Sequence, residues 1–256
     1  MNDTTRDLID GVQRFSLART DAALKVNERR LRIMAHELRN TVGGCHGLLE
    51  LVLDASSHEL PDQVRRDLRM AHRSASEALQ IVDQQLGLAK LRAGHLLPRI
   101  DEFSVQDMLD ELAVTYRALR RSDAVALVVE RVGPKVTIRT DRHLLVQVLR
   151  NLISNALKFT DAGEVRIGAA TGDGEIAFSV ADTGLGIGDE DQERIFDEFA
   201  QVDDAQRGRP LGTGLGLPFV RQVTQLLGGR LELDSSLGEG STFRVIVPSQ
   251  RNRSQP

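Results

Sequence analysis

His36 has neighbours suited to catalysis: the acidic Glu37 follows it directly, and the amide of Asn40 lies one helical turn further on. Most histidines on helices are structural, but an exposed neutral imidazole is a competent nucleophile, and an adjacent carboxylate can serve as its general base. His46 is a competing candidate, yet no acidic residue follows it. We therefore expect His36 and Glu37 to form a nucleophile and base pair.

The helix face that carries His36 also contains three glycines, Gly43, Gly44 and Gly47. Each glycine inside a helix is about 1 kcal/mol less favourable than alanine. Three of them give up stability and leave the surface beside His36 almost bare. This pattern favours close approach by another protein surface.

A second group of polar residues occurs in the run 151–160, where Asn151, Asn155 and Lys158 follow one another at helical steps of four and three. One helix face would then present two amide oxygens and an ammonium group. Magnesium prefers oxygen ligands and keeps several waters, so a neutral amide, such as that of Asn155, together with nucleotide phosphates could complete its shell. The alternative is an asparagine-capped turn. Asparagine is unfavourable inside a helix, so two of them within one helix favour the functional interpretation over the capped turn.

Asp182, Gly184, Gly186 and Ile187 follow a predicted strand directly. A carboxylate in this place can accept the exocyclic amine of adenine, and the glycines let the backbone approach the ring. Taken alone, the segment could be a simple turn. The nearby run Ile195–Phe199 could anchor a mobile segment, although singly it fits a piece of helix core better.

A glycine-rich run leads into a predicted helix and comprises Gly212, Thr213, Gly214, Leu215 and Gly216. Backbone N–H groups and the positive end of the helix dipole would face phosphate there. The run lacks the lysine and hydroxyl residue of a Walker loop and the preceding strand of a dinucleotide fingerprint. It therefore predicts phosphate binding of another kind.

These residues must be positioned by two different kinds of structure. In the first part, apolar residues recur every seven positions at Leu17, Leu24, Leu31, Leu38, Cys45 and Val52, with Met34 and Leu48 between them. Such a seam requires a partner helix. A second amphipathic helix runs from about Pro61 to Gly94, and the short link 54–60 makes the two antiparallel. Dimerisation into a four-helix bundle would cover both apolar stripes.

The remainder of the chain alternates helices with β-branched strands, which predicts an α/β sandwich with a mixed sheet covered on one face. Expected helices are 105–120, 142–158 and about 215–227. Expected strands are 125–132, 136–140, 165–170, 175–181, 230–233 and 242–247. We place an N-terminal coiled-coil segment and helical hairpin in residues 1–97, the α/β domain in 98–250 and a disordered tail in 251–256.

Composition excludes several classes of protein. The 256 residues carry a formal net charge of −4, which gives no global attraction to nucleic acid, and the single cysteine, Cys45, cannot form an internal disulfide. No apolar stretch approaches the roughly 18–20 residues of a membrane span, and the N-terminus does not resemble a secretory signal. We expect a cytoplasmic protein without a transmembrane segment.

The segment His36-Glu37-Leu38-Arg39-Asn40 resembles the phosphoacceptor box of two-component sensor histidine kinases. The four later segments resemble, in order, the N, G1, F and G2 boxes of the kinase ATP-binding domain, within the superfamily of gyrase, heat-shock chaperone and mismatch-repair ATPases. The resemblance covers roughly residues 25–248. It implies a homodimer that binds ATP and Mg²⁺, phosphorylates His36, and passes the phosphoryl group to an aspartate on a response regulator receiver domain.

The resemblance also assigns roles to individual residues. Asn40 would position water for dephosphorylation of the regulator, and Phe159 closes the N box. Residues 187–211 would form a lid over ATP, from which Arg207 or Arg209 could reach the γ-phosphate. The Thr242 hydroxyl, in the closing strand motif 240–243, would share a water with Asp182 and adenine.

Some positions depart from the family pattern. Thr41 and Val42 stand where proline and leucine usually follow the phosphoacceptor box, and Gln201 stands where a basic residue is frequent. These departures motivate an alternative, a catalytically weak dimeric scaffold that binds nucleotide. A third interpretation, an ATPase acting on nucleic acid, is disfavoured by the acidic charge and the upstream histidine helix.

Overall fold

The computed structural model describes residues 37–53, 60–92, 94, 96–118, 124–133, 136–200 and 213–250. It divides the chain into two compact units, Met1–Ala89 and Lys90–Pro256. The division falls within the last turns of a long helix, a few residues before the expected boundary at 97. His36, Arg207, Gly212, the first half of the predicted seam and the tail 251–256 lie outside the described residues.

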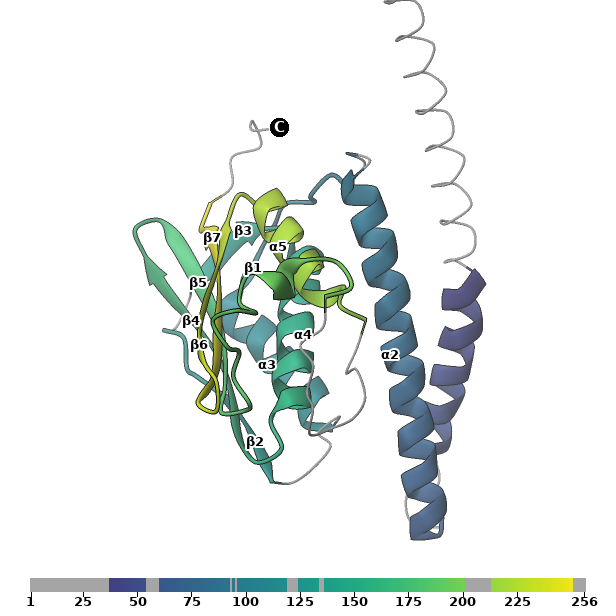
Figure 1. Ribbon diagram of the computed structural model, residues 1–256. Coiled ribbons are helices and arrows are strands. Elements are labelled where there is room, and N and C mark those ends of the chain that lie inside the picture. Colours follow the sequence, from purple (N-terminus) through teal and green to yellow (C-terminus); the bar gives the residue numbers. More distant parts are fainter. Residues whose placement is uncertain are drawn as a thin grey trace, which may run out of the picture. The chain divides into compact units, whose positions relative to one another are not determined.

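Two antiparallel helices form the described part of the first unit: residues 37–53 and α2 (Asp62–Arg92) (Figure 1). Arg39, near the start of the first helix, donates from Nε to Oδ1 of Asp83, near the end of α2, over 3.0 Å. His46 lies further along the first helix and meets His72, which lies earlier in α2. The expected hairpin of antiparallel helices is thus confirmed for these residues.

The first helix continues without a break through Thr41 and Val42, which replace the usual proline and leucine. The Thr41 hydroxyl donates to the carbonyl of Glu37 over 2.9 Å, in the i−4 pattern of helical threonines.

No helix in the described part of the chain is both long and apolar enough to cross a lipid bilayer.

The second unit contains a five-stranded mixed sheet with the strand order β2-β4-β5-β7-β6. Only the β2–β4 pair is parallel. The strands are β2 (Val125–Val129), β4 (Gly163–Gly172), β5 (Glu175–Asp182), β7 (Gly240–Pro248) and β6 (Arg230–Ser236).

Three helices cover one face of this sheet (Figure 1): α3 (Val105–Ala118), α4 (Arg142–Phe159) and α5 (Gly216–Leu226). Alternate strand residues point into this layer, so Ile176, Phe178 and Val180 of β5 are at most 1% exposed. Phe219 of α5 and Leu152 of α4 are equally buried. The predicted α/β sandwich, covered on one face, is confirmed.

A short strand, β1 (Asp101–Ser104), was not predicted from the sequence. It pairs antiparallel with β3 (Thr137–Thr140) in a separate two-stranded sheet. Two of its four residues are acidic, and acidic residues are depleted in strands, so local propensity gives no signal. Its strand conformation comes from pairing with residues more than thirty positions away.

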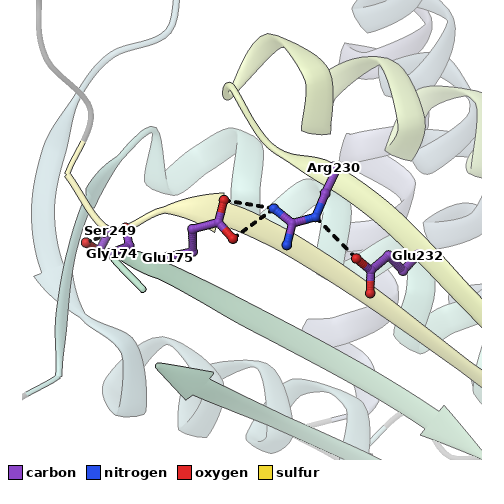
Figure 2. Close-up of polar contacts among 5 residues, drawn as sticks. All are labelled: Gly174, Glu175, Arg230, Glu232 and Ser249. Atoms are coloured by element: carbon purple, nitrogen blue, oxygen red, sulfur yellow. Dashed lines mark hydrogen bonds and ion pairs between the residues drawn. The ribbon is translucent and has the colours of Figure 1, made fainter. Parts of the chain in front are cut away.

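The opposite face of the main sheet carries a network of ion pairs (Figure 2). Nη1 of Arg230, in β6, lies 2.8 Å from both carboxylate oxygens of Glu175 in β5, and Nε lies 3.2 Å from Glu232. The pair spans β7 at Ile246, the register partner of Arg230, which is only 6% exposed. Charged side chains thus shield an apolar residue on the helix-free face.

Candidate nucleotide site and phosphoacceptor helix

Helix α4, which carries the first predicted binding motif, is fixed at its start by Asp141. Oδ1 of Asp141 accepts the N–H of Leu144 over 2.9 Å, as expected of an N-cap, and Oδ2 accepts the N–H of Arg99 over 2.6 Å. Asp141 is 5% exposed, so both bonds are shielded from water. A helix held in this way can position Asn155 reproducibly.

The two asparagines of α4 have different environments. Asn151 is 4% exposed, and its amide nitrogen donates to the carbonyl of Gln147 within the same helix over 2.9 Å. Asn155 is half-buried, and its side chain forms no hydrogen bond within the described part of the chain. Asn155 therefore retains a free amide oxygen, whereas the amide of Asn151 is already engaged in the helix.

The end of α4 is joined to the loop that follows β5. Leu185 donates its N–H to the carbonyl of Phe159 over 3.3 Å. A Cβ at Gly184 would collide with this same carbonyl, so only glycine fits the approach. Lys158, next to Phe159, is half-buried, with its ammonium 5.4 Å from the Phe159 ring centroid. The first two predicted motifs therefore lie together.

Asp182 ends β5 with its carboxylate held in one orientation, because Oδ1 accepts the N–H of Gly184 over 2.9 Å. Burial raises the pKa of Asp182 above its usual value, and hydrogen bonds from the backbone of Gly184 and Ser241 oppose that rise. The residue is only part-buried. The carboxylate is thus a fixed acceptor in a partly dry environment.

The loop after Asp182 is tied to the β6–β7 hairpin by backbone and hydroxyl contacts. Gly186 has a φ of +66°, and a Cβ there would collide with the carbonyl of Ser236. Ile187 donates its N–H to Oγ of Ser235 over 2.8 Å, and Gly238 donates to the carbonyl of Leu185 over 2.6 Å. The hairpin therefore determines the shape of this loop.

The residue that faces Asp182 from β7 is Ser241, and not the predicted Thr242. Asp182 pairs with Ser241, whereas Thr242 pairs with Ala181. Side chains of adjacent strand residues point to opposite faces, so Thr242 lies on the helix-free face and not beside Asp182. The expectation that Thr242 shares a water with Asp182 therefore does not fit this register, and Ser241 takes the place beside Asp182. The signal was available, because Ser241 is in step with buried Phe243 and Val245.

Ser241 is buried and lies 3.0 Å, oxygen to oxygen, from Ser235 on β6. The Ser235 hydroxyl donates to the carbonyl of Gly240 over 2.9 Å while accepting the N–H of Ile187. Ser235 thus connects the closing strand motif to the loop after Asp182. This positioning role has no local sequence signal, because it depends on the pairing of β6 with β7.

The glycine-rich segment that begins helix α5 is described from Thr213. Helix α5 starts at Gly216, and its N-cap residue, Leu215, forms no side-chain capping hydrogen bond among the described residues. Gly214 has a φ of +68°, and a Cβ there would lie 2.6 Å from the backbone of Phe199 and Ala200. The first-turn N–H groups and the positive end of the helix dipole are the features that could bind an anion here.

The aromatic motif is joined to this segment. Phe199 donates its N–H to the carbonyl of Gly214 over 3.0 Å. Within the motif, Ile195 is buried in a short 3₁₀ helix, and the guanidinium of Arg221 from α5 lies 5.1 Å from the Phe196 ring centroid. The motif therefore anchors the described end of the segment 187–200 against the start of α5.

On the helix of the first unit, Glu37 and Asn40 are both exposed. An added Cβ at Gly43, Gly44 or Gly47 would meet nothing within 4 Å, which agrees with the expected bare surface. His36 itself precedes the described residues. Carboxylate, amide and bare surface are thus accessible on the same helix.

Comparison with known proteins agrees with both halves of this arrangement. Residues 27–94 match the His Kinase A (phospho-acceptor) domain, and residues 140–251 match the histidine kinase-, DNA gyrase B- and HSP90-like ATPase. The chain is 36% identical over 230 residues to the sensor histidine kinase AruS of Pseudomonas aeruginosa, covering 87% of the chain and 23% of AruS. It is 30% identical over 253 residues to the autoinducer 2 sensor kinase/phosphatase LuxQ of Vibrio vulnificus, covering 95% of the chain and 29% of LuxQ.

Among solved structures, full-length ShkA in complex with AMPPNP superposes with a TM-score of 0.65 at 29% identity, over 86% of this chain and 45% of that one. The chain therefore spans only about a quarter of the two curated relatives and less than half of ShkA. Both domain matches and the relatives agree on the family. The chain belongs to the two-component sensor histidine kinases and contains their phosphoacceptor and ATP-binding domains.

Proposed function

We propose that this chain is an ATP-dependent protein histidine kinase that phosphorylates His36 and passes the phosphoryl group to an aspartate on a response regulator. The observation that carries the proposal is the cradle around Asp182. It joins a fixed carboxylate, a glycine-bounded loop and the N-terminus of helix α5 in one domain. That domain follows a helix in which an exposed Glu37 comes directly after His36.

In this proposal the domain recognises each part of ATP with a different element. The carboxylate of Asp182 accepts the adenine amine, and buried Ser241 replaces Thr242 as the neighbouring hydroxyl. Backbone N–H groups at Gly214, Leu215 and Gly216 bind phosphate oxygens. We also propose that Arg207 and Gly212 take part in phosphate binding, as predicted from the sequence.

The donor set of α4 fits a magnesium ion that accompanies the nucleotide. Asn155 offers a neutral amide oxygen that forms no hydrogen bond with the described residues, and Mg²⁺ prefers such oxygen ligands while keeping several waters. Mg²⁺ would supply neutralisation of phosphate charge. Lys158 adds a positive charge from the same helix. The side-chain amide of Asn151 donates to the backbone carbonyl of Gln147 in that helix.

At the phosphoacceptor, one His36 nitrogen attacks the γ-phosphorus, a P–N bond forms, and the bond from that phosphorus to the bridging oxygen of ADP breaks. Glu37 accepts the proton of the other ring nitrogen. Catalysis of this kind rests on positioning and charge neutralisation. The bare surface at Gly43, Gly44 and Gly47 supports close approach of a partner domain to His36.

Homodimerisation is part of the proposal, because the hairpin leaves large apolar side chains uncovered. Leu48 and Leu51 of the first helix are 65% and 66% exposed, and Met70 of α2 is 62% exposed. A second hairpin would cover them in a four-helix bundle. We further propose a cytoplasmic location, and dephosphorylation of the regulator with water positioned by exposed Asn40.

Incubation of the purified chain with Mg²⁺ and γ-labelled ATP, beside the His36→Gln variant, tests the proposal. Label that is acid-labile and alkali-stable on the wild type alone would support the kinase and its acceptor together. Nucleotide binding without label on either protein would contradict the proposal and favour the dimeric scaffold. DNA-stimulated hydrolysis that survives His36→Gln would instead favour the nucleic-acid ATPase.

A further inference from the structure

Three potential metal ligands meet between the helices of the first unit, away from the phosphoacceptor box. They are His46 and Glu50 on the helix 37–53, and His72 on α2. One ligand atom from each residue lies within 4.8 Å of the others. The kinase reaction proposed above uses none of these side chains.

The backbone holds the three residues together from both sides. His46 and Glu50 are four positions apart, so they share one face of their helix. His72 approaches from the antiparallel helix, and its ring centroid lies 4.1 Å from that of His46 at an interplanar angle of 31°. Both histidines are half-buried, whereas Glu50 is exposed. The two histidines therefore form the less accessible side of the cluster, and Glu50 forms the side that is exposed to solvent.

Two imidazoles and one carboxylate are the donor set of a borderline transition metal. Zn²⁺ binds imidazole nitrogen at about 2.0–2.1 Å and carboxylate oxygen at about 2.0–2.2 Å, which places ligand atoms roughly 3.4 Å apart around a tetrahedral ion. The three ligand atoms lie within 4.8 Å of one another, so binding an ion would require side-chain rotations that bring them to this spacing. Mg²⁺ demands oxygen ligands, so this site differs in chemistry from the Mg²⁺ site proposed at Asn155.

We propose that His46, Glu50 and His72 form a binding site for a divalent transition-metal ion, with Zn²⁺ as its representative. Three protein ligands leave a fourth position open to water. The ion would join the two helices of the hairpin at one level. His46 lies ten residues after His36 in the sequence, and the ion would tie the helix 37–53, which begins directly after His36, to α2.

Calorimetric titration of the chelator-treated full chain with Zn²⁺, without nucleotide and with Mg²⁺ in excess, tests this site. We expect one ion per chain. The His72→Gln variant should bind Zn²⁺ more weakly by at least the roughly 10–100-fold typical of losing an outer-shell partner, because it loses a direct ligand. The Glu50→Gln variant should also weaken binding, and this exposed substitution places no demand on the packing of the hairpin.

His143→Gln is the matched control, because His143 is exposed on α4, where its ring is hydrogen-bonded to the side-chain amide of Gln147. It should bind Zn²⁺ like the wild type. Circular dichroism of each variant verifies that the helices are retained. Absence of saturable Zn²⁺ binding by the wild type would overturn the proposal without reference to any variant. Undiminished binding by both Glu50→Gln and His72→Gln would overturn it too.

Discussion

At the scale of single residues, Asp182 shows how burial can serve recognition. Its carboxylate is oriented by the N–H of Gly184, and burial raises its pKa above the usual aspartate value. The folded state therefore binds more protons than the unfolded state around that pKa. The contribution of Asp182 to the free energy of unfolding falls as pH rises from the ordinary aspartate pKa through the raised pKa. It stays low at any pH above the raised pKa.

The same shift predicts a pH-dependent preference for ATP over inosine triphosphate. Ionised Asp182 accepts the adenine amine, whereas protonated Asp182 donates to the inosine carbonyl, so selectivity should decline as pH falls through the raised pKa. A hydrogen bond to a charged group contributes about 1.5–3 kcal/mol, or roughly 10–150-fold in affinity. Calorimetry of both nucleotides across pH measures the ratio, in which phosphate titration cancels.

In the Asp182→Asn variant the ATP preference should be small and independent of pH. The variant should also unfold at neutral pH at the same temperature as the wild type or a higher one, because it removes a part-buried charge. A wild-type ratio that stays constant at every pH would contradict the assigned role of Asp182.

Ser241 and Thr242 offer a direct test of strand register. The Ser241→Ala variant should bind ATP more weakly by about 0.5–1.5 kcal/mol, because Ser241 faces Asp182. The Thr242→Val variant is its matched control, because Thr242 lies on the helix-free face and should leave affinity unchanged. Fluorescence titration with an ATP analogue measures both. The reverse ranking would restore the original assignment of Thr242.

At the scale of elements, contacts between the ends of helices and the loops beside them shape the site. Helix α4 is adjacent to both β5 and α5, so the asparagine motif shares neighbours with the Asp182 loop and the glycine-rich segment. Each loop is closed by backbone bonds to another element: Leu185 to Phe159, and Phe199 to Gly214. Loops fixed in this way present N–H groups with little reorganisation on binding.

The Gly214→Ala variant should lose ATP affinity and also some stability. Its φ of +68° disfavours alanine by about 1–2 kcal/mol, and its Cβ would press on the backbone of Phe199 and Ala200. Thermal unfolding and nucleotide titration measure the two effects. The Gly172→Ala variant in β4 is the control, because a Cβ there meets nothing within 4 Å, and it should leave both quantities nearly unchanged. Unaltered affinity in Gly214→Ala would argue against phosphate binding at this turn.

At the scale of the whole molecule, the uncovered apolar side chains of the hairpin predict the oligomeric state. The Leu51→Lys variant should shift the chain from dimer to monomer in sedimentation, because burying a leucine contributes about 1.5–3 kcal/mol and two copies are lost in each dimer. ATP affinity of the second unit should remain. The Leu97→Lys variant changes a leucine that is 82% exposed outside the helical hairpin and should stay dimeric. A monomeric wild type would contradict the bundle.

The sequence by itself determined the order and type of most elements and motifs. Helix α4 was expected at 142–158 and spans Arg142–Phe159, and β5 was expected at 175–181 and spans Glu175–Asp182. Both have strong local signals: an apolar period near 3.6 in one and a β-branched, alternating run in the other. The glycines at 184, 186 and 214 were identified because close backbone approach permits few other residues.

Only the tertiary structure decided which side chains face one another. Strand β1 forms because β3 is there to pair with it, Ser241 rather than Thr242 faces Asp182 because of the β5–β7 register, and Asn151 is buried by the packing of α4. The metal cluster likewise requires His72 to meet His46 across the hairpin. Each depends on residues distant in sequence, and a local pattern contains no information about their spacing in the fold.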